Sequence, residues 1–556
     1  MKKWVTGVSA VVLAASLVLA GCSGNGNSGG GKTAEPPKTE APKTDAKPDS
    51  GAKKVQDTLI VGRGGDSAAL DPSIVTDGES FKATHQIFDT LLEYKEGTTE
   101  VQAGLAESWK VSPDGLVYTF NLRKGVKFHD GTDFNADAVV FNFNRWRDPN
   151  SPYKFQGDSF DYYTSQFGGA KDDVIKEVKA VDPNTVQFTL NKPQAPFLQN
   201  IAMPTFGIGS PKAIQEKKEK FKSEPVGTGA FIFKEWKRND SITLEKNPNY
   251  WKQGFPKLNK IIIRSIPDNS ARLTALKNGE LDLIEGVNPD DVKNIEADKN
   301  LKKINRPSFN VGYVGFNLKH KPFDDAKVRV ALNYAVNKKA IIQAFYGGNA
   351  EPAVNPMPKS LWGHNNDIKD YDYDLEKAKK LLADAGYPNG LPGEYTFYAM
   401  PVARPYMPDG KKVAEAIQQD FAKIGVKTKI VSPEWATYLD DTKKGEKDDI
   451  YMLGWNGDNG DPDNFLYALL DKNNAGGNNK SFYMNEEVHK LLSEAQAMTD
   501  QAKRTENYKK AQEIIKADAP WAPIAHSTPI LASKANIDGY VPSPTGSESY
   551  EKVSFK

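Results

Sequence analysis

The histidines are the first candidates for chemistry, because they serve as metal ligands and as acid–base groups. The sequence has six of them: His85, His129, His320, His364, His489 and His526. No two have the spacing of metal ligands on one helix face, and no His-Glu-x-x-His motif occurs. The Gly-x-Ser-x-Gly pattern of serine hydrolases and the P-loop pattern of many ATPases occur at 26–30 and 26–33. Both lie in the Gly- and Ser-rich stretch before residue 57, which is too poor in apolar residues to form the strand and helix that these motifs connect. A peptidase or an ATPase built on these motifs is therefore not expected.

Acidic and amide side chains cluster at residues 458–464, which read Asp-Asn-Gly-Asp-Pro-Asp-Asn. The cluster lacks the glycine at the sixth position and the glutamate at the twelfth that an EF-hand calcium loop requires. Three interpretations stay open at this point. The cluster could bind a metal ion, it could form a turn stabilised by Asx side chains, or it could contact a ligand.

A glycine-rich stretch follows the apolar segment 59–61, with Gly62, Gly64 and Gly65 close together. A dinucleotide-binding motif would need glycine at position 67, where the sequence has Ser67. We therefore expect a loop that another backbone approaches closely, with a simple turn as the alternative.

The elements around these residues belong to a mixed α/β protein. Alternating apolar residues predict strands at 117–122, 241–244, 260–264 and 426–430, and a hairpin at 174–190 whose turn is 182–184. Apolar residues at helical spacing predict helices around 328–336, 375–385, 413–424, 491–495 and 508–515. Asp374 and Gly386 have the residue types of a helix N-cap and C′ stop. Because strand-rich and helix-rich regions alternate over long stretches, we expect two or three lobes.

The composition is that of a soluble globular protein with a large core. Of 556 residues, 38% are hydrophobic and 26% are charged, and the 73 Lys+Arg nearly balance the 72 Asp+Glu. A net charge of +1 gives no general attraction to nucleic acid, and no nucleic-acid partner is expected. With one cysteine, an intramolecular disulfide is impossible and a zinc site built on several cysteines is excluded.

The N-terminus predicts export and lipid attachment. Two lysines precede an apolar segment at 5–20 that is short for a membrane span, and the segment ends in Leu-Ala-Gly-Cys22. This ending resembles the bacterial lipobox. We expect a signal peptide at 1–21, a lipidated Cys22, and a disordered linker at 22–56 rich in Gly, Ser, Pro and Lys. The expected location is the extracytoplasmic face of the bacterial cell membrane, with a Gram-positive surface favoured over a periplasm.

Several motifs in residues 57–556 resemble those of the extracellular solute-binding proteins, family 5, of peptide and nickel ABC importers. The carrying segments include 103–109 (AGLAESW), 125–131 (GVKFHDG), 225–231 (PVGTGAF) and 247–251 (NPNYW). Segments 400–406 (MPVARPY), 454–465 (GWNGDNGDPDNF) and 524–528 (IAHST) most resemble those of the dipeptide-binding proteins. Met407, where such proteins usually have a polar Asn, is a departure that affects the expected pocket shape.

The resemblance implies a two-lobed periplasmic-binding-protein fold that closes on its ligand like a flytrap. Lobe I is expected at 57–308 plus 528–556, with an extra subdomain at about 95–230 that contributes little to the pocket. Lobe II is expected at 309–527. The two hinge crossings are expected at Asn310–Tyr313 and Ala525–Thr528.

The resemblance also implies which residues bind the ligand. Asp458 is expected to pair with the ammonium of a dipeptide, and Arg404 with its carboxylate. Trp455 and Tyr406 are expected to line side-chain pockets, and the loop containing Gly65 and Ser67 to contact the peptide backbone.

The resulting hypothesis is a monomeric, non-catalytic lipoprotein, without cofactor or bound metal, that captures dipeptides or short peptides and delivers them to an ABC permease. The alternatives are capture of haem or a nickel chelate by the same fold, for which His526 is the one histidine considered, and a peptide-sensing receptor. An extracellular peptidase is a further alternative that no motif supports.

Overall fold

The computed structural model of the chain describes residues 56–169 and 173–556. The predicted signal peptide, Cys22 and the predicted linker, except for Gln56, lie outside these residues. Within the described ranges, no helix has the length and apolar character needed to cross a membrane.

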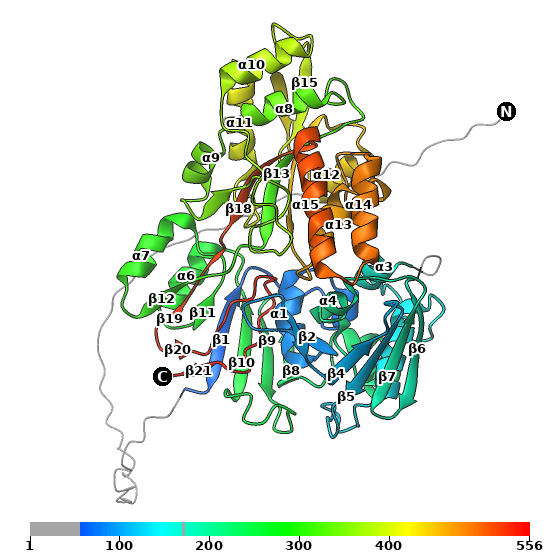
Figure 1. Cartoon of the computed structure of the whole chain (residues 1–556). Helices are drawn as coiled ribbons and strands as arrows, with labels where there is room; N and C mark the ends of the chain where they lie inside the picture. Colours follow the sequence, from blue (N-terminus) through cyan, green and yellow to red (C-terminus); the bar gives the residue numbers. More distant parts are fainter. Residues whose placement is uncertain (1–55, 170–172) are drawn as a thin grey trace, which may run out of the picture. The chain divides into compact units, whose positions relative to one another are not determined.

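The first lobe is built on a mixed seven-stranded sheet (Figure 1). In spatial order its strands are β12 (Leu301–Asn305), β19 (Ile530–Lys534), β11 (Leu283–Ile284), β1 (Thr58–Arg63), β10 (Lys260–Ser265), β9 (Ser241–Lys246) and β8 (Phe231–Lys237). Its helices are α1 (Gly78–Ile87), α6 (Asn269–Lys277) and α7 (Val292–Ala297). Strand β1 is central and parallel to both β10 and β11, so the glycine-rich loop that follows it begins at the carboxyl edge of the sheet.

A second, antiparallel sheet occupies much of the region 95–230. Its strands, in spatial order, are β4 (Ala106–Val111), β5 (Val117–Leu122), β7 (Thr185–Leu190) and β6 (Ile175–Asp182). Helices α2 (Ala136–Arg147), α3 (Asp161–Phe167), α4 (Phe197–Ile201) and α5 (Pro211–Lys217) accompany it. Its residues share one hydrophobic core with those of the seven-stranded sheet, for example Phe120 and Phe188 with Leu59 and Ile261.

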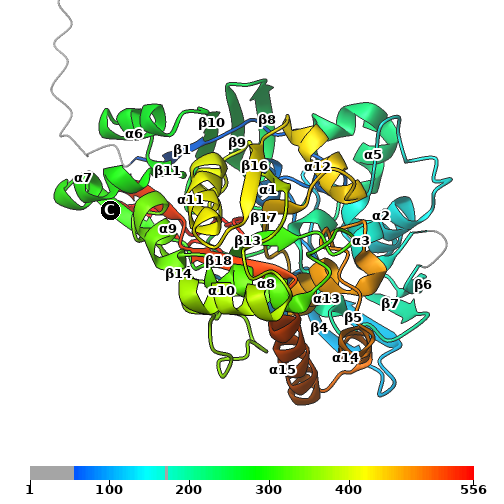
Figure 2. The same cartoon turned by 90° about the horizontal axis from the view of Figure 1, so that it is seen from above.

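The second lobe has its own six-stranded sheet and its own hydrophobic core. In spatial order the strands are β14 (Ala350–Pro352), β18 (Trp521–Ser527), β13 (Asn310–Phe316), β17 (Ile450–Asn456), β15 (Glu394–Tyr398) and β16 (Lys427–Val431). The helices are α8 (Ala326–Tyr334), α9 (Lys338–Phe345), α10 (Leu375–Asp384), α11 (Gly410–Lys423), α12 (Trp435–Lys444), α13 (Asp463–Leu470), α14 (Glu486–Ala497) and α15 (Gln501–Asp518). Figure 2 shows α11 packed beside β16.

Short elements complete the described chain. Two small two-stranded sheets pair β2 (Leu92–Tyr94) with β3 (Val101–Ala103) and β20 (Ile537–Asp538) with β21 (Ser554–Phe555). Single 3-10 turns are found at Pro72–Ile74, Pro204–Phe206, Lys218–Lys222, Pro289–Asp291 and Lys472–Asn474.

Most predicted elements are confirmed. The strand at 117–122 is β5, the hairpin is β6 and β7, and the helix after Asp374 is α10. The Asp374 side chain accepts a hydrogen bond from the backbone N–H of Lys377, and Gly386 has a φ of +94°, as expected of a helix start and stop. The apolar residues Ala335 and Val336 lie in the turn after α8 rather than within that helix.

The chain passes between the two large sheets twice, at 306–309 and at 528–529. The first predicted hinge, Asn310–Tyr313, lies just after its crossing and belongs to β13. The second, Ala525–Thr528, reaches its crossing at Thr528, while Ala525–Ser527 belong to β18. The two segments are hydrogen-bonded to each other: the Asn310 side-chain amide donates to the Ser527 carbonyl (3.0 Å), and the Ser527 N–H donates to the Asn310 side-chain oxygen (2.9 Å). This pairing joins the two crossings where they enter the second lobe.

Candidate ligand-binding site

A cavity of about 1740 Å³ lies between residues of the two large sheets. From the first lobe, its lining includes Gly64, Glu79, Lys82, Arg272, Glu285 and Arg306. From the second lobe, it includes Tyr313, Arg404, Tyr406, Trp455, Asp458 and Lys480. Pockets for small ligands usually measure about 300–1,000 Å³, so this cavity is large enough for a short peptide with its side chains.

Two loops of the second lobe bring Arg404 and Asp458 to this cavity. Strands β15 and β17 are neighbours and run parallel, and the loop holding Arg404 follows β15 while the loop holding Asp458 follows β17. Ligand sites of α/β sheets are usually found outside the carboxyl ends of parallel strands. The sheet topology therefore places both charged residues at one edge.

Asp458 is held by side chains from both lobes. Its Oδ1 accepts a hydrogen bond from the Tyr162 hydroxyl (3.0 Å) and its Oδ2 accepts one from the Asn464 amide (3.2 Å). Burial raises the pKa of Asp458 to about 6, against the opposing effect of these two hydrogen bonds. Among the described residues of 95–230, Tyr162 alone lines the cavity, so the subdomain adds one residue there, and that residue touches the acidic group.

The Asn464 side chain also fixes Trp455. Its Oδ1 accepts hydrogen bonds from the Trp455 indole (2.9 Å) and from the Asp458 backbone N–H (3.1 Å). One amide thus orients both the aromatic ring and the carboxylate.

The other acidic residues of the 458–464 cluster have structural roles. Asp461 forms a buried ion pair with Arg504 (2.8 Å), and Asp463 accepts from Gln496 (3.0 Å). The Asn459 and Asp461 side chains each accept from a backbone N–H two residues later, as in Asx turns. In the part of the chain that the structure describes, no group of three or more His, Cys, Asp or Glu side chains could hold a metal ion.

Arg404 is exposed to the cavity and forms no ion pair with any other described residue. Its backbone pairs with Met407 in a tight bridge, with N–H to carbonyl distances of 3.0 and 2.9 Å. Met407 is fully buried and does not line the cavity, so its departure from the family pattern affects the core rather than the pocket wall.

Tyr406 packs onto the sheet where two glycines leave room for it. A Cβ at Gly454 of β17 would overlap the Tyr406 ring, and a Cβ at Gly312 of β13 would overlap its carbonyl oxygen. The Tyr346 hydroxyl donates to that carbonyl (2.8 Å). Burial raises the pKa of Tyr406, and the Arg404 positive charge acts in the opposite direction.

The structure brings together four of the six predicted ligand-binding residues, namely Arg404, Tyr406, Trp455 and Asp458, on the cavity wall. Gly65 and Ser67 are not on it. Ser67 is buried, and its hydroxyl accepts a hydrogen bond from the Arg63 guanidinium (2.9 Å), while the Gly65 carbonyl accepts from the Ser265 hydroxyl (3.1 Å). Of this loop, Gly64 faces the cavity.

Sequence reasoning missed a group of charged residues on the first-lobe wall. Arg306 pairs with Glu285 (2.6 Å) and with Glu548, and Lys82 pairs with Glu285 and with Glu79 (3.1 Å). Burial alone would raise the pKa of Glu285, but the Lys82 and Arg306 cations overcome that effect and lower it to about 2. These residues come from four distant segments of the chain, so no local sequence pattern could have grouped them.

A cavity between two α/β lobes, with opposite charges on its wall, defines a ligand-binding protein. The family model "Bacterial extracellular solute-binding proteins, family 5 Middle" matches residues 100–477. The chain therefore belongs to this family of solute-binding proteins, and it is a binding protein rather than an enzyme.

Two curated relatives and one solved structure are similar over nearly the whole chain. Heme-binding protein A of Haemophilus influenzae is 43% identical over 498 residues, covering 87% of this chain and 90% of that protein. The dipeptide-binding protein of Escherichia coli is 41% identical over 513 residues, covering 90% and 95%.

The solved structure is that of the ABC transporter-associated periplasmic binding protein DppA from Helicobacter pylori in complex with peptide STSA. It superposes with a TM-score of 0.78 at 38% identity and covers 90% of this chain and 98% of that chain. This similarity confirms the predicted two-lobed periplasmic-binding-protein fold.

Proposed function

We propose that this protein captures dipeptides and other short peptides outside the membrane and delivers them to the permease of an ABC importer. The observation that carries the proposal is the presence on the wall of one cavity of Asp458 and of Arg404, which has no ion pair with another described residue. A short peptide is a zwitterion, and two opposite charges fixed on the edge of one sheet match its two ends. The similarity to the Escherichia coli dipeptide-binding protein supports this ligand class.

The two charged residues suit the two ends of a peptide for different reasons. The Asp458 carboxylate accepts hydrogen bonds from an ammonium group, and the planar Arg404 guanidinium binds a carboxylate through two parallel hydrogen bonds. When the lobes close around the peptide, water leaves and both ion pairs become buried. Removing either partner then costs about 2–5 kcal/mol of binding free energy.

Two charges that bind the two ends of a dipeptide would also select for peptide length. A longer peptide bound by its ammonium at Asp458 would place its terminal carboxylate beyond Arg404. We therefore expect dipeptides to raise the melting temperature more than tetrapeptides or free amino acids do, by mass action on the folded state. Equal shifts for all three ligand classes, measured by scanning fluorimetry at one concentration, would contradict the length selection. Native mass spectrometry of the purified protein would reveal copurified ligands directly.

Haem is the second candidate ligand, because Heme-binding protein A of Haemophilus influenzae is 43% identical to this chain. The histidines give it no support: His526 is buried, its Nδ1 lies 2.7 Å from the Asn310 carbonyl, and no histidine of the described residues lines the cavity. Burial also lowers the pKa of His526 to about 4. Titration with haemin, followed in the Soret band, distinguishes the two ligands, and we expect dipeptide to bind without a competing haem complex.

We further propose that Cys22 carries a lipid anchor and that residues 22–56 tether the folded body to the membrane. The support is the lipobox-like sequence and the position of the one cysteine. Two acyl chains give stable anchoring where one is marginal. The full chain expressed in a bacterial host should partition into detergent, and Cys22→Ala should move it to the aqueous phase. A sensing role would use the same cleft, and peptide uptake by a strain lacking this protein separates sensing from import.

A further inference from the structure

One part of the cavity wall lies apart from the two residues proposed to bind the ends of a peptide. Helix α12 contributes Trp435, Leu439, Asp440 and Lys443 to it, of which Asp440 is paired with Lys444. Leu469 of α13 and Lys480, in a loop, also line it. Trp435, Leu439 and Lys443 are four positions apart, so they lie along one face of the helix. This face presents two apolar side chains followed by a positive charge.

The two lysines of this region have no partners of opposite charge. No ion pair or side-chain hydrogen bond joins Lys443 or Lys480 to any other described residue. Other lysines near the cavity are paired: Lys82 with Glu79 (3.1 Å), Lys412 with Asp409 (2.9 Å) and Lys444 with Asp440 (2.6 Å). Lys443 and Lys480 therefore add positive charge to a wall whose nearby carboxylates are Asp440, which is paired with Lys444, and the buried Asp448.

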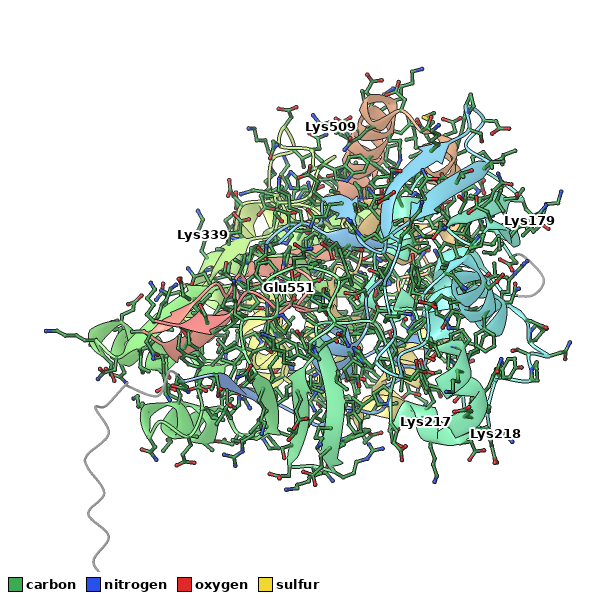
Figure 3. The ribbon with its side chains drawn as sticks, turned by 90° about the horizontal axis from the view of Figure 1, so that it is seen from below. Lys179, Lys217, Lys218, Lys339, Lys509 and Glu551 are labelled. Atoms are coloured by element: carbon green, nitrogen blue, oxygen red, sulfur yellow. The ribbon has the colours of Figure 1, made fainter. Side chains whose placement is uncertain are left out.

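The position of Lys480 makes this arrangement unfavourable without an anion. Lys480 is half-buried, in contrast to exposed lysines such as Lys179, Lys218 and Lys339 at the edge of the molecule in Figure 3. Burial and the nearby Lys443 charge lower the pKa of Lys480 to about 8, while Asp448 and Asp440 act in the opposite direction. A bound anion stabilises a half-buried ammonium beside a like charge more than it stabilises an exposed ammonium.

We propose that Lys443 and Lys480 bind a second carboxylate of the ligand, supplied by an acidic side chain of the bound peptide. The inference rests on the proposed function, and it names the peptides that the site prefers. Arg404 is itself unpaired and has the planar shape that suits a terminal carboxylate, so it leaves the lysines for another group. A glutamate side chain has methylene groups ending in a carboxylate, which matches apolar Trp435, Leu439 and Leu469 leading to two cations.

The test is calorimetric titration of the full folded protein with peptides that differ in one group. Ala-Glu and Glu-Ala are compared with Ala-Gln and Gln-Ala, which have the same shape but no charge on the side chain. The tripeptide Ala-Ala-Ala has no acidic side chain, but its terminal carboxylate lies one residue further from its ammonium group. The proteins are the wild type, the double variant Lys443→Met/Lys480→Met, the charge-retaining Lys480→Arg, and Lys339→Met as the control. Lys339 is exposed, lies in the second lobe and does not line the cavity.

In the wild type, one of the two glutamate peptides should bind about tenfold more tightly than its glutamine twin, since an ion pair that is partly desolvated contributes more than a neutral hydrogen bond. The double variant should bind both twins with equal affinity. Lys480→Arg and Lys339→Met should keep the tenfold ratio. Unchanged melting temperatures of the unliganded variants show that the fold is retained, and Lys480→Arg tests the charge without removing it.

Three results would overturn the inference. Equal affinities for the twins in the wild type reject the acidic subsite while the proposed function stands. If the double variant loses affinity for Ala-Ala-Ala alone, the lysines bind the terminal carboxylate of a longer peptide, and the assignment to an acidic side chain is rejected. Failure of every peptide to bind the wild type rejects the proposed function and the inference with it.

Discussion

The two walls of the cavity both have charged residues, but they differ in how those charges are satisfied. On the first-lobe wall, Lys82, Glu285 and Arg306 form ion pairs with one another and with Glu79 and Glu548. On the second-lobe wall, Lys412 is paired with Asp409, but Arg404, Lys443 and Lys480 have no ion pair with any described residue. Charges that are already paired stabilise the fold, whereas unpaired charges in a cavity are available to a ligand.

The location of the paired network explains its structural role. Arg306 begins the first crossing between the lobes, and its backbone N–H donates to the carbonyl of Pro529 in the second crossing (2.9 Å). Its guanidinium reaches Glu548 near the C-terminus, and the Gln86 amide of α1 donates to the carbonyl of the same residue (2.7 Å). The network therefore holds both crossings against the first lobe.

The largest effect should come from removing one charge of the ion-pair network on the first-lobe wall. Arg306→Ala leaves the buried Glu548 carboxylate without its ion-pair partner and leaves Glu285 with Lys82 alone, which costs about 3–5 kcal/mol of unfolding free energy. Chemical denaturation at neutral pH measures it. The control is Lys303→Ala on β12, which removes a more exposed ion pair with Glu296 (2.6 Å) and should cost less than about 1 kcal/mol. Equal losses for the two variants would show that the network is not a structural centre.

The next largest effect is expected at Arg404 on the second-lobe wall, and it changes peptide affinity rather than stability. Arg404→Ala should weaken dipeptide binding by about 2–5 kcal/mol, because the peptide carboxylate would be buried without a partner. The unliganded protein should keep its melting temperature, since Arg404 is exposed and has no ion pair to lose. Calorimetric titration and thermal unfolding of the same sample give both values.

Arg404→Lys sharpens the same comparison. Lysine keeps the charge but lacks the planar fork, so its affinity should lie between those of the wild type and the alanine variant. An alanine variant that binds dipeptides like the wild type would remove Arg404 from the site.

The contrast between the walls also shows how far the sequence could predict this molecule. Local patterns were sufficient for the elements: alternation found β5, and the pair Asp374 and Gly386 bounded α10. The residues Arg404 and Asp458 were found through a family resemblance, since nothing in their spacing indicates that β15 and β17 are neighbours.

What could not be predicted depends on contacts between distant segments. Tyr162 meets Asp458 across 296 positions, and Arg306 meets Glu548 across 242. Ser67 was expected at the ligand, but Arg63, four residues earlier in the chain, takes its hydroxyl. A motif identifies which residue types are present, and only the packing decides which of them remain free to bind.

The pH dependence of peptide binding tests the role of Asp458 on the second-lobe wall. Because burial raises the pKa of Asp458 to about 6, the carboxylate proposed to bind the peptide ammonium is lost as pH falls below 6. Dipeptide affinity should therefore decrease about tenfold per pH unit below that value, which corresponds to about 1.4 kcal/mol.

Stability should respond to Asp458 in the opposite direction. The folded protein binds a proton at Asp458 more tightly than the unfolded chain does, so this group's contribution to unfolding free energy rises as pH falls from about 6 towards 3.8, the usual pKa of an aspartate. Asp458→Asn removes the titrating group and serves as the control, because its stability profile lacks this component. Affinity that stays constant between pH 7 and 5 in the wild type would separate Asp458 from the ligand.

The smallest effect is expected at Tyr162, a first-lobe residue whose hydroxyl contacts Asp458 on the second-lobe wall. Tyr162→Phe keeps the ring but removes the hydroxyl that donates to Asp458 (3.0 Å), and this hydrogen bond lowers the pKa of that carboxyl. Without it, the pKa of Asp458 should rise further, and dipeptide affinity at pH 6 should fall by about 1 kcal/mol, the usual contribution of one hydrogen bond. At pH 8 the carboxylate is ionised in both proteins, so the difference should shrink. A loss that is the same at both pH values would instead assign Tyr162 a direct contact with the peptide, since such a contact does not depend on the protonation of Asp458.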